Sequence, residues 1–97
     1  RPWPDYVFAE DYNLPSIESI EQFIKSEKHL PEMPTAEEVA ADGVALGEMN
    51  RLLLQKVEEL TLYTIEQQKE IKQLKEGENV LIRQLLKRIE KIENSQK

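Results

Sequence analysis

The second half of the chain carries the strongest constraint on the fold. From Leu46 onward there is no proline, and apolar residues recur at spacings that alternate between three and four. This pattern is the heptad repeat of a coiled coil, in which positions a and d face a partner helix. With Leu53 and Leu60 at d, Val57 falls at a between them. We therefore expect residues 46–97 to form one long helix that associates with copies of itself.

The predicted seam, formed by the a and d positions, contains polar residues as well as apolar ones. Buried polar residues in a seam usually fix the register or the number of chains. After Leu74 the best seam requires an extra four-residue step, a stutter that locally unwinds a supercoil. Glu70 at g and Lys75 at the following e can pair between parallel chains, so we expect a parallel arrangement. The predicted oligomer interface consists of Leu46, Leu53, Val57, Leu60, Thr64, Gln67, Ile71, Leu74, Ile82, Leu85, Ile89 and Ile92.

Gly77 leaves two interpretations open. It can lie inside one continuous helix, because an internal Gly costs only about 1 kcal/mol relative to Ala. Alternatively, it can end the helix, with Asn79 capping a separate helix over residues 80–94 that folds back as a hairpin. The continuous helix is favoured, because the two residues Glu78 and Asn79 are a short connection for a reversal.

Residues 1–45 are predicted to form a small head. Four of the six aromatic residues of the chain lie in its first 13 positions, and the segment from Tyr6 to Ala9 has the composition of a short strand. We expect an extended aromatic arm here. The alternative is a loop with a local aromatic cluster.

The first helix of the head is expected over residues 17–28, with Ser16 as its N-cap. Its apolar side and the aromatic arm are predicted to cover apolar residues of the long helix that lie outside the seam, namely Leu52, Leu54, Leu62 and Ile65. The predicted head-packing residues are Trp3, Tyr6, Phe8, Ile17, Ile20, Phe23 and Ile24.

A second short helix is expected over residues 36–42. The prolines of segment 29–34 end the first helix in an irregular turn, because proline lacks a backbone donor and displaces its predecessor from helical geometry. Thr35 and Glu38 then have the spacing of a capping box. Gly43 can close the second helix in left-handed geometry.

Composition argues against two classes of partner. The formal net charge is −6, whereas phosphate recognition relies on clustered Lys and Arg. No apolar run approaches the roughly 20 residues that a membrane-spanning helix needs. We therefore expect neither nucleic acid nor a membrane as a partner. Without Cys the chain has no disulfide and no thiolate metal site.

No arrangement of residues in the sequence indicates catalysis. The single histidine, His29, has no HxxxH or HExxH spacing around it and is expected to lie in a turn. There is no glycine-rich phosphate loop, and the serines lack an accompanying base. Carboxylates such as those of Glu58 and Glu59 fall on helical faces, where solvation is the ordinary explanation. We expect no enzymatic activity, no cofactor and no metal.

A series of short motifs runs through residues 3–68 in a specific order: WPDYVF, YNL, HLP, LGEM and KVEELTLY. In these motifs the chain resembles the C-terminal region of tail-fibre-like and surface fibre proteins of Bacteroidetes-type bacteria. The resemblance implies an assembly role at the end of a long fibre, without catalysis. In placement it is also distantly similar to the endosialidase-type intramolecular chaperones, although their Ser-centred cleavage motif is not visible here.

Pattern and resemblance together predict an all-α assembly module with a small helical head and a long parallel coiled-coil helix. We expect it to be the C-terminal part of a longer protein whose N-terminal fibre it brings into register. The resemblance implies a location outside the cell or on a phage-like particle. The alternative is a fibre tip that binds a ligand or receptor through exposed head aromatics.

The number of chains predicted from the sequence is three. Leu54 at e, together with Met49 and Tyr63 at g, broadens the apolar face, and three helices bury a broad face better than two. The fibre resemblance also favours a homotrimer. A homodimer is the alternative, because Val57 at a with Leu60 at d is a combination that favours two strands.

Overall fold

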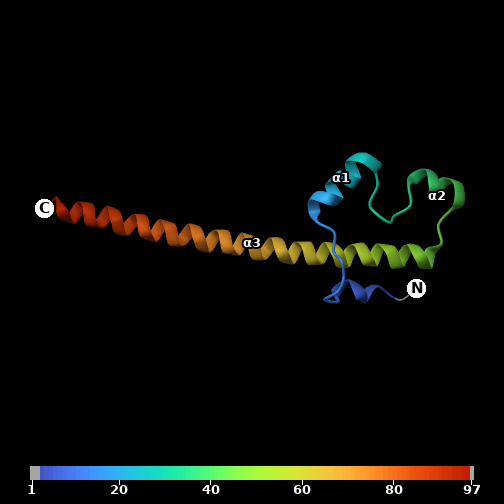
Figure 1. The fold of residues 1–97 in the computed structure, drawn as a ribbon, viewed down its shortest axis with the longest axis horizontal. Helices are drawn as coiled ribbons and strands as arrows, with labels where there is room; N and C mark the ends of the chain where they lie inside the picture. The colour runs from blue at the N-terminus through green and yellow to red at the C-terminus, as the bar shows by residue number, and fades with distance from the viewer. Residues whose placement is uncertain (1–2, 97) are drawn as a thin grey trace. The chain divides into compact units, whose positions relative to one another are not determined.

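The computed structural model describes residues 3–96, and all of their regular secondary structure is helical. The elements in chain order are the 3₁₀-helix η1 (Pro4–Phe8) and the α-helices α1 (Ile17–Glu27), α2 (Ala36–Asp42) and α3 (Leu46–Ser95) (Figure 1). The all-α fold class predicted from the sequence is confirmed. None of the described helices combines the length and hydrophobicity that crossing a membrane requires.

The aromatic arm is the element that the sequence predicted wrongly. Instead of a strand from Tyr6 to Ala9, the segment Pro4–Phe8 forms the 3₁₀-helix η1. Pro4 lies in its first turn, where the fixed φ of proline suits a helix start and its missing N–H is not needed. The backbone is extended at the flanking residues Trp3 and Ala9. This local preference outweighs the strand propensity of a short aromatic run.

The two short helices of the head begin and end close to their predicted bounds. In α1 the side chain of Ser16 accepts a hydrogen bond from the N–H of Ser19, and Lys28 ends the helix in left-handed geometry with φ 63°. In α2 the predicted capping box is confirmed: Thr35 and Glu38 each accept from the other's backbone N–H at 3.1 Å. Gly43 has the positive φ expected of it, 74°, but its ψ of −168° lies outside the left-handed helical region.

The long helix α3 has 50 residues and continues through Gly77. The alternative of a break there with a hairpin is therefore wrong. The chain divides into two compact units, one that ends at Leu62 and one that begins at Tyr63. The first unit thus contains η1, α1, α2 and the initial turns of α3, and the second unit is the remainder of α3.

Candidate self-association site

The initial turns of α3 carry a row of polar side chains that is buried within the first unit. Its members follow one another at helical spacing, so they share one side of the helix, and we call them the polar face: Arg51, Gln55, Glu58 and Glu59. Each is at most 6% exposed. Glu58 and Glu59 are expected in solvent from the sequence, and this prediction is wrong: both side chains are buried, because the head lies over them.

Arg51 and Gln55 hold the aromatic arm by hydrogen bonds. The hydroxyl of Tyr6 donates to Oε1 of Gln55 at 2.8 Å, and Nη1 of Arg51 donates to the hydroxyl of Tyr6 at 3.1 Å. The guanidinium of Arg51 also forms a two-pronged ion pair with the carboxylate of Glu48, and this pair raises the pKa of Arg51. A polar bridge therefore joins η1 to α3.

A second group of polar contacts fixes the segments on either side of α1. The Tyr12 hydroxyl donates to Oε2 of Glu59, while Nε2 of Gln55 donates to both carboxylate oxygens of Glu32 at 3.2 and 3.3 Å. Nζ of Lys56 lies between Glu32 and Glu59, 3.1 and 3.2 Å from their carboxylates. Burial raises the pKa of Tyr12, and its hydrogen bond to Glu59 raises it further. The head is thus attached to α3 largely through polar groups.

Apolar packing of the head is correspondingly thin. Val7 and Leu52 are buried, whereas Leu54 and Leu62 are half-buried and Ile65 is exposed, so the predicted cover of the long helix is only partial. Among the predicted head-packing residues, Tyr6, Ile20 and Phe23 are half-buried. The others lie mainly at the surface of the single chain: Trp3, Phe8, Ile17 and Ile24.

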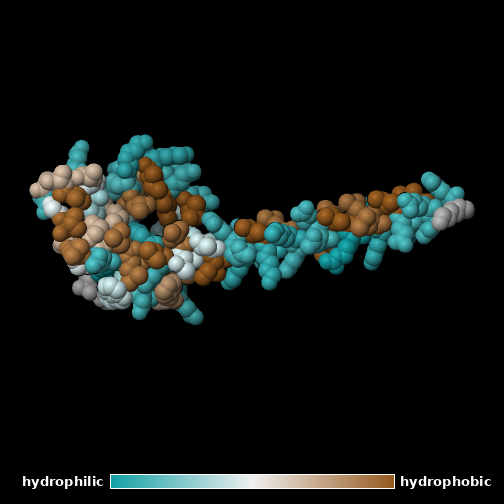
Figure 2. Space-filling view, turned by 180° about the vertical axis from the view of Figure 1, so that it is seen from behind, coloured by the Kyte–Doolittle hydropathy of each residue, from teal (hydrophilic) through white to brown (hydrophobic). Residues whose placement is uncertain are grey.

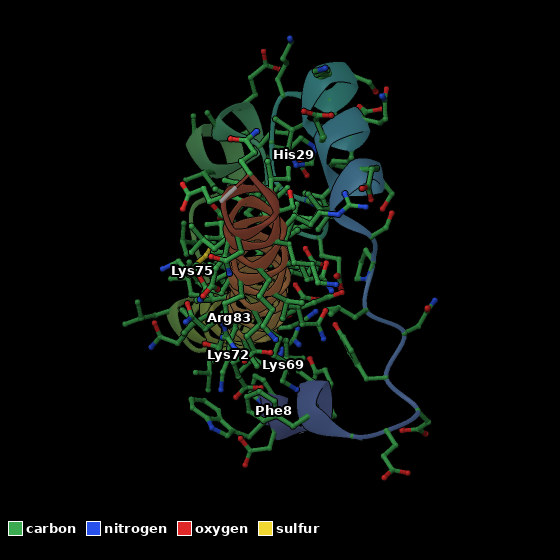
Figure 3. The ribbon with its side chains drawn as sticks, turned by 90° about the vertical axis from the view of Figure 1, so that its left-hand side faces the viewer. Phe8, His29, Lys69, Lys72, Lys75 and Arg83 are labelled. Carbon is green, nitrogen blue, oxygen red and sulfur yellow. The ribbon has the colours of Figure 1, made fainter. Side chains whose placement is uncertain are left out.

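His29 lies in the turn after α1, near the ring of Phe23 (Figure 3). The two rings meet edge to face with their centroids 5.3 Å apart, and Nδ1 of His29 lies 2.8 Å from the carbonyl oxygen of Leu30. These contacts agree with the turn-packing role expected of this histidine. Within residues 3–96 no cluster of His, Asp and Glu side chains has a metal-binding arrangement.

The predicted seam lies on the side of α3 opposite the polar face. Leu53 and Gln55, for example, are two residues apart and so point about 160° away from each other around the helix. In the first unit the apolar seam residues are 48–73% exposed: Leu46, Leu53, Val57 and Leu60. The head therefore covers one side of these turns and leaves the seam open.

The seam continues through the second unit as an exposed apolar stripe. Figure 2 shows hydrophobic side chains along one edge of this part of α3 and hydrophilic ones along the other. Lys69, Lys72 and Arg83 project from the same side of the helix (Figure 3). The seam residues of this unit are all exposed: the polar Thr64 and Gln67 and the apolar Ile71, Leu74, Ile82, Leu85, Ile89 and Ile92.

The stutter brings the average spacing of the seam close to the period of a straight helix. From Leu53 to Ile92 the seam takes 11 steps over 39 residues, about 3.55 residues per step, which lies between the 3.5 of a strict heptad repeat and the 3.6 of a straight helix. The shift after Leu74 therefore keeps the apolar stripe on one side of α3 with only gentle supercoiling.

No protein-family model, curated protein or solved structure matches this chain. Its long helix, with exposed apolar side chains at coiled-coil spacing, is the arrangement of a self-associating coiled-coil module. The sequence identified this stripe from its period alone. It could not identify the polar face, because partners more than 40 residues away decide which charged side of a helix is buried.

The burial of Glu58 in the polar face can be tested by the pH dependence of stability. One of its carboxylate oxygens, Oε1, is buried without a hydrogen-bond partner among the described residues. Burial raises the pKa of Glu58, and the charge of Asp5 and a hydrogen bond with it raise the pKa further. The folded chain therefore binds this proton more tightly than the unfolded chain does. Its contribution to stability is largest below the unfolded pKa of about 4.3 and is lost as pH rises through the folded pKa.

We expect Glu58→Gln to raise the free energy of unfolding at neutral pH and to change it little below about pH 4, as measured by urea denaturation. Glu38→Gln is a control of opposite sign. Hydrogen bonds from Thr35 lower the pKa of Glu38, so its contribution is present above the unfolded pKa and is lost as pH falls through the folded pKa. A loss of stability at neutral pH in the Glu58 variant would contradict this account.

Proposed function

We propose that the chain is a structural assembly module, without catalytic activity, that brings copies of a larger protein together in parallel and in register. The observation that carries the proposal is the exposure of the apolar seam along α3 on the side away from the head. Apolar side chains exposed at this spacing are best buried by a neighbouring helix with the same pattern.

At the end of a fibre, this association would align the chains before the fibre folds. Fibres of intertwined strands have high contact order, so their chains fold productively only after they have been brought together in register. A coiled coil forms through local contacts and can supply that register quickly. The support for a fibre context is the set of short motifs between residues 3 and 68, and the fibre itself is the proposed N-terminal partner.

The association is tested by sedimentation equilibrium and by one spin label. The mass should be a whole multiple of the 11.4 kDa chain over a wide concentration range. Since the chain has no Cys, Gln96→Cys gives a single labelling site. In a parallel assembly the labels lie side by side, whereas antiparallel helices would place them about 75 Å apart. A monomer at high concentration would contradict the proposal, and the long distance would contradict its orientation.

A binding tip is the second candidate, and the exposure of Trp3 and Phe8, 62% and 53%, is what favours it. Trp3 is the only tryptophan of the chain, so its fluorescence reports on its surroundings. A blue shift on association means that a neighbouring copy covers it, which supports assembly. An emission that stays typical of water in the associated chain leaves Trp3 available to a ligand.

A further inference from the structure

We propose that the seam of α3 takes one partner, a second copy of this chain that lies parallel and in register, so that the assembly is a dimer. The inference rests on the proposed function, because it specifies the partner of the same seam. It replaces the trimer expected from the sequence with the two-chain alternative.

The distribution of side-chain shapes along the seam favours two chains. β-branched residues at a with Leu at d favour two-stranded parallel coiled coils. Most apolar seam positions follow this rule on both sides of the stutter, with Ile92 at d as the exception. The a positions include Val57, Ile71, Ile82 and Ile89, and the d positions include Leu53, Leu60, Leu74 and Leu85.

The chain itself covers the side chains that broaden the apolar face of its long helix. The trimer was expected because Met49, Leu54 and Tyr63 broaden the apolar face. In the structure Met49 and Leu54 are half-buried, and Tyr63 is only 8% exposed. These side chains are therefore already shielded from water in the single chain. The face that stays exposed in the first unit is the narrow a/d stripe, which suits one neighbouring helix.

Asn50 also fits a parallel pair in register. It occupies an a position near the start of α3 and is exposed in the single chain. An Asn at an a position specifies the register and number of chains in parallel coiled coils. In a parallel pair the two Asn50 side-chain amides meet across the axis and can hydrogen-bond to each other. A shifted register would instead bury the amide against apolar residues.

Charge complementarity next to the seam also fits a second copy. In a parallel pair each g residue faces the e residue five positions later in the partner. Glu70 then faces Lys75, and Arg88 faces Glu93, so both fully charged pairs are of opposite sign. The remaining pairs contain no like charges. They are Met49 with Leu54, Lys56 with Thr61, Tyr63 with Gln68, and Leu81 with Leu86.

The pair of Leu81 and Leu86 accounts for the widest part of the exposed stripe. Both leucines are more than half exposed, at 56% and 59%. At g and e they would broaden the face of a single helix. In a parallel pair they pack on each other across the seam, twice per dimer, and need no third helix.

Two charge-swapped variants test partner, register and number of chains together. The first carries Lys75→Glu with Glu93→Arg, and the second carries Glu70→Lys with Arg88→Glu. Each has the net charge of the native chain, so the two are matched controls for each other. Every charged g–e pair is repulsive within either variant and attractive between the two. We expect each variant alone to associate at least tenfold more weakly than the mixture, and native mass spectrometry to find one copy of each in the mixed species.

The outcomes separate the two proposals. A native chain that stays monomeric overturns the proposed function. A native trimer, or mixed species of three chains, overturns the dimer but leaves assembly intact. Variants that prefer their own kind overturn the parallel register. If a variant does not fold on its own, recovery of helical circular dichroism on mixing supports the pairing, and the mass of the native chain still decides the number of chains.

Discussion

Replacing Leu85 and Ile89 together by Asp should abolish self-association and unfold much of the second unit. Both side chains are about half exposed in the single chain, 48% and 52%, and need a neighbouring helix to be buried. Full burial of a Leu or Ile contributes roughly 1.5–3 kcal/mol, and about half of each side chain remains to be buried. In the proposed pair four such side chains therefore lose about 3–6 kcal/mol, roughly two to four orders of magnitude in Kd. Most helical stability in proteins comes from packing of an apolar face, so loss of the partner should unfold much of this unit.

Sedimentation and circular dichroism measure the two effects of this change. The matched control is Gln73→Asp with Gln84→Asp, which adds the same charge to exposed positions on the other side of the same helix. We expect the control to keep its mass and most of its helicity. Equal losses in both variants would mean that added charge, rather than the seam, is responsible.

Replacing Gln55 by Ala should release the arm and the turn before α2 from α3. Gln55 is 3% exposed and bonds to Tyr6, Glu32 and Tyr12. Tyr6, Tyr12 and Glu32 keep other partners in Arg51, Glu59 and Lys56. The change therefore removes hydrogen bonds without orphaning these groups, and at about 0.5–1.5 kcal/mol for each bond a total of about 3 kcal/mol is expected. A unit of this size is stable by only about 3–9 kcal/mol. The change should therefore lower the thermal midpoint of the head and speed amide exchange in η1.

Gln22→Ala is the control for this change, because Gln22 is an exposed glutamine on α1. It should leave both measurements nearly unaltered. The association of the Gln55 variant is equally informative, since the seam lies on the other side of α3. An unchanged oligomeric mass supports separate sides for head and partner, whereas a monomer would show that the docked head is needed to present the seam.

Local signals in the sequence were sufficient for the helices and insufficient for their attachment. The helices depend on residues close to them in the sequence: Ser16 caps α1, Thr35 and Glu38 form the capping box of α2, and a regular apolar period runs along α3. These predictions are confirmed. The arm was missed because one proline at a helix start outweighed a run of strand-forming residues. The polar face was missed because Arg51 and Gln55 resemble solvated residues until Tyr6 is placed beside them.

The same limit applies to the number of chains, which the sequence predicts to be three. From the sequence, Met49 and Leu54 are apolar residues next to a seam and broaden it. In the structure both are half-buried before any partner arrives. The sequence pattern therefore indicates how much apolar surface a helix has. Only the fold shows which part of that surface is buried within the single chain and which part remains for a partner.

The polar attachment of the head also affects the order of events during folding. Hydrogen bonds to the polar face use none of the apolar side chains of the seam. The head can therefore fold while the seam stays exposed and able to associate. Head docking is intramolecular and independent of concentration, while pairing must wait for an encounter. We therefore expect a delay between the two steps that becomes longer as the concentration of chains falls. During this delay the head is folded, while the seam of α3 has no partner yet.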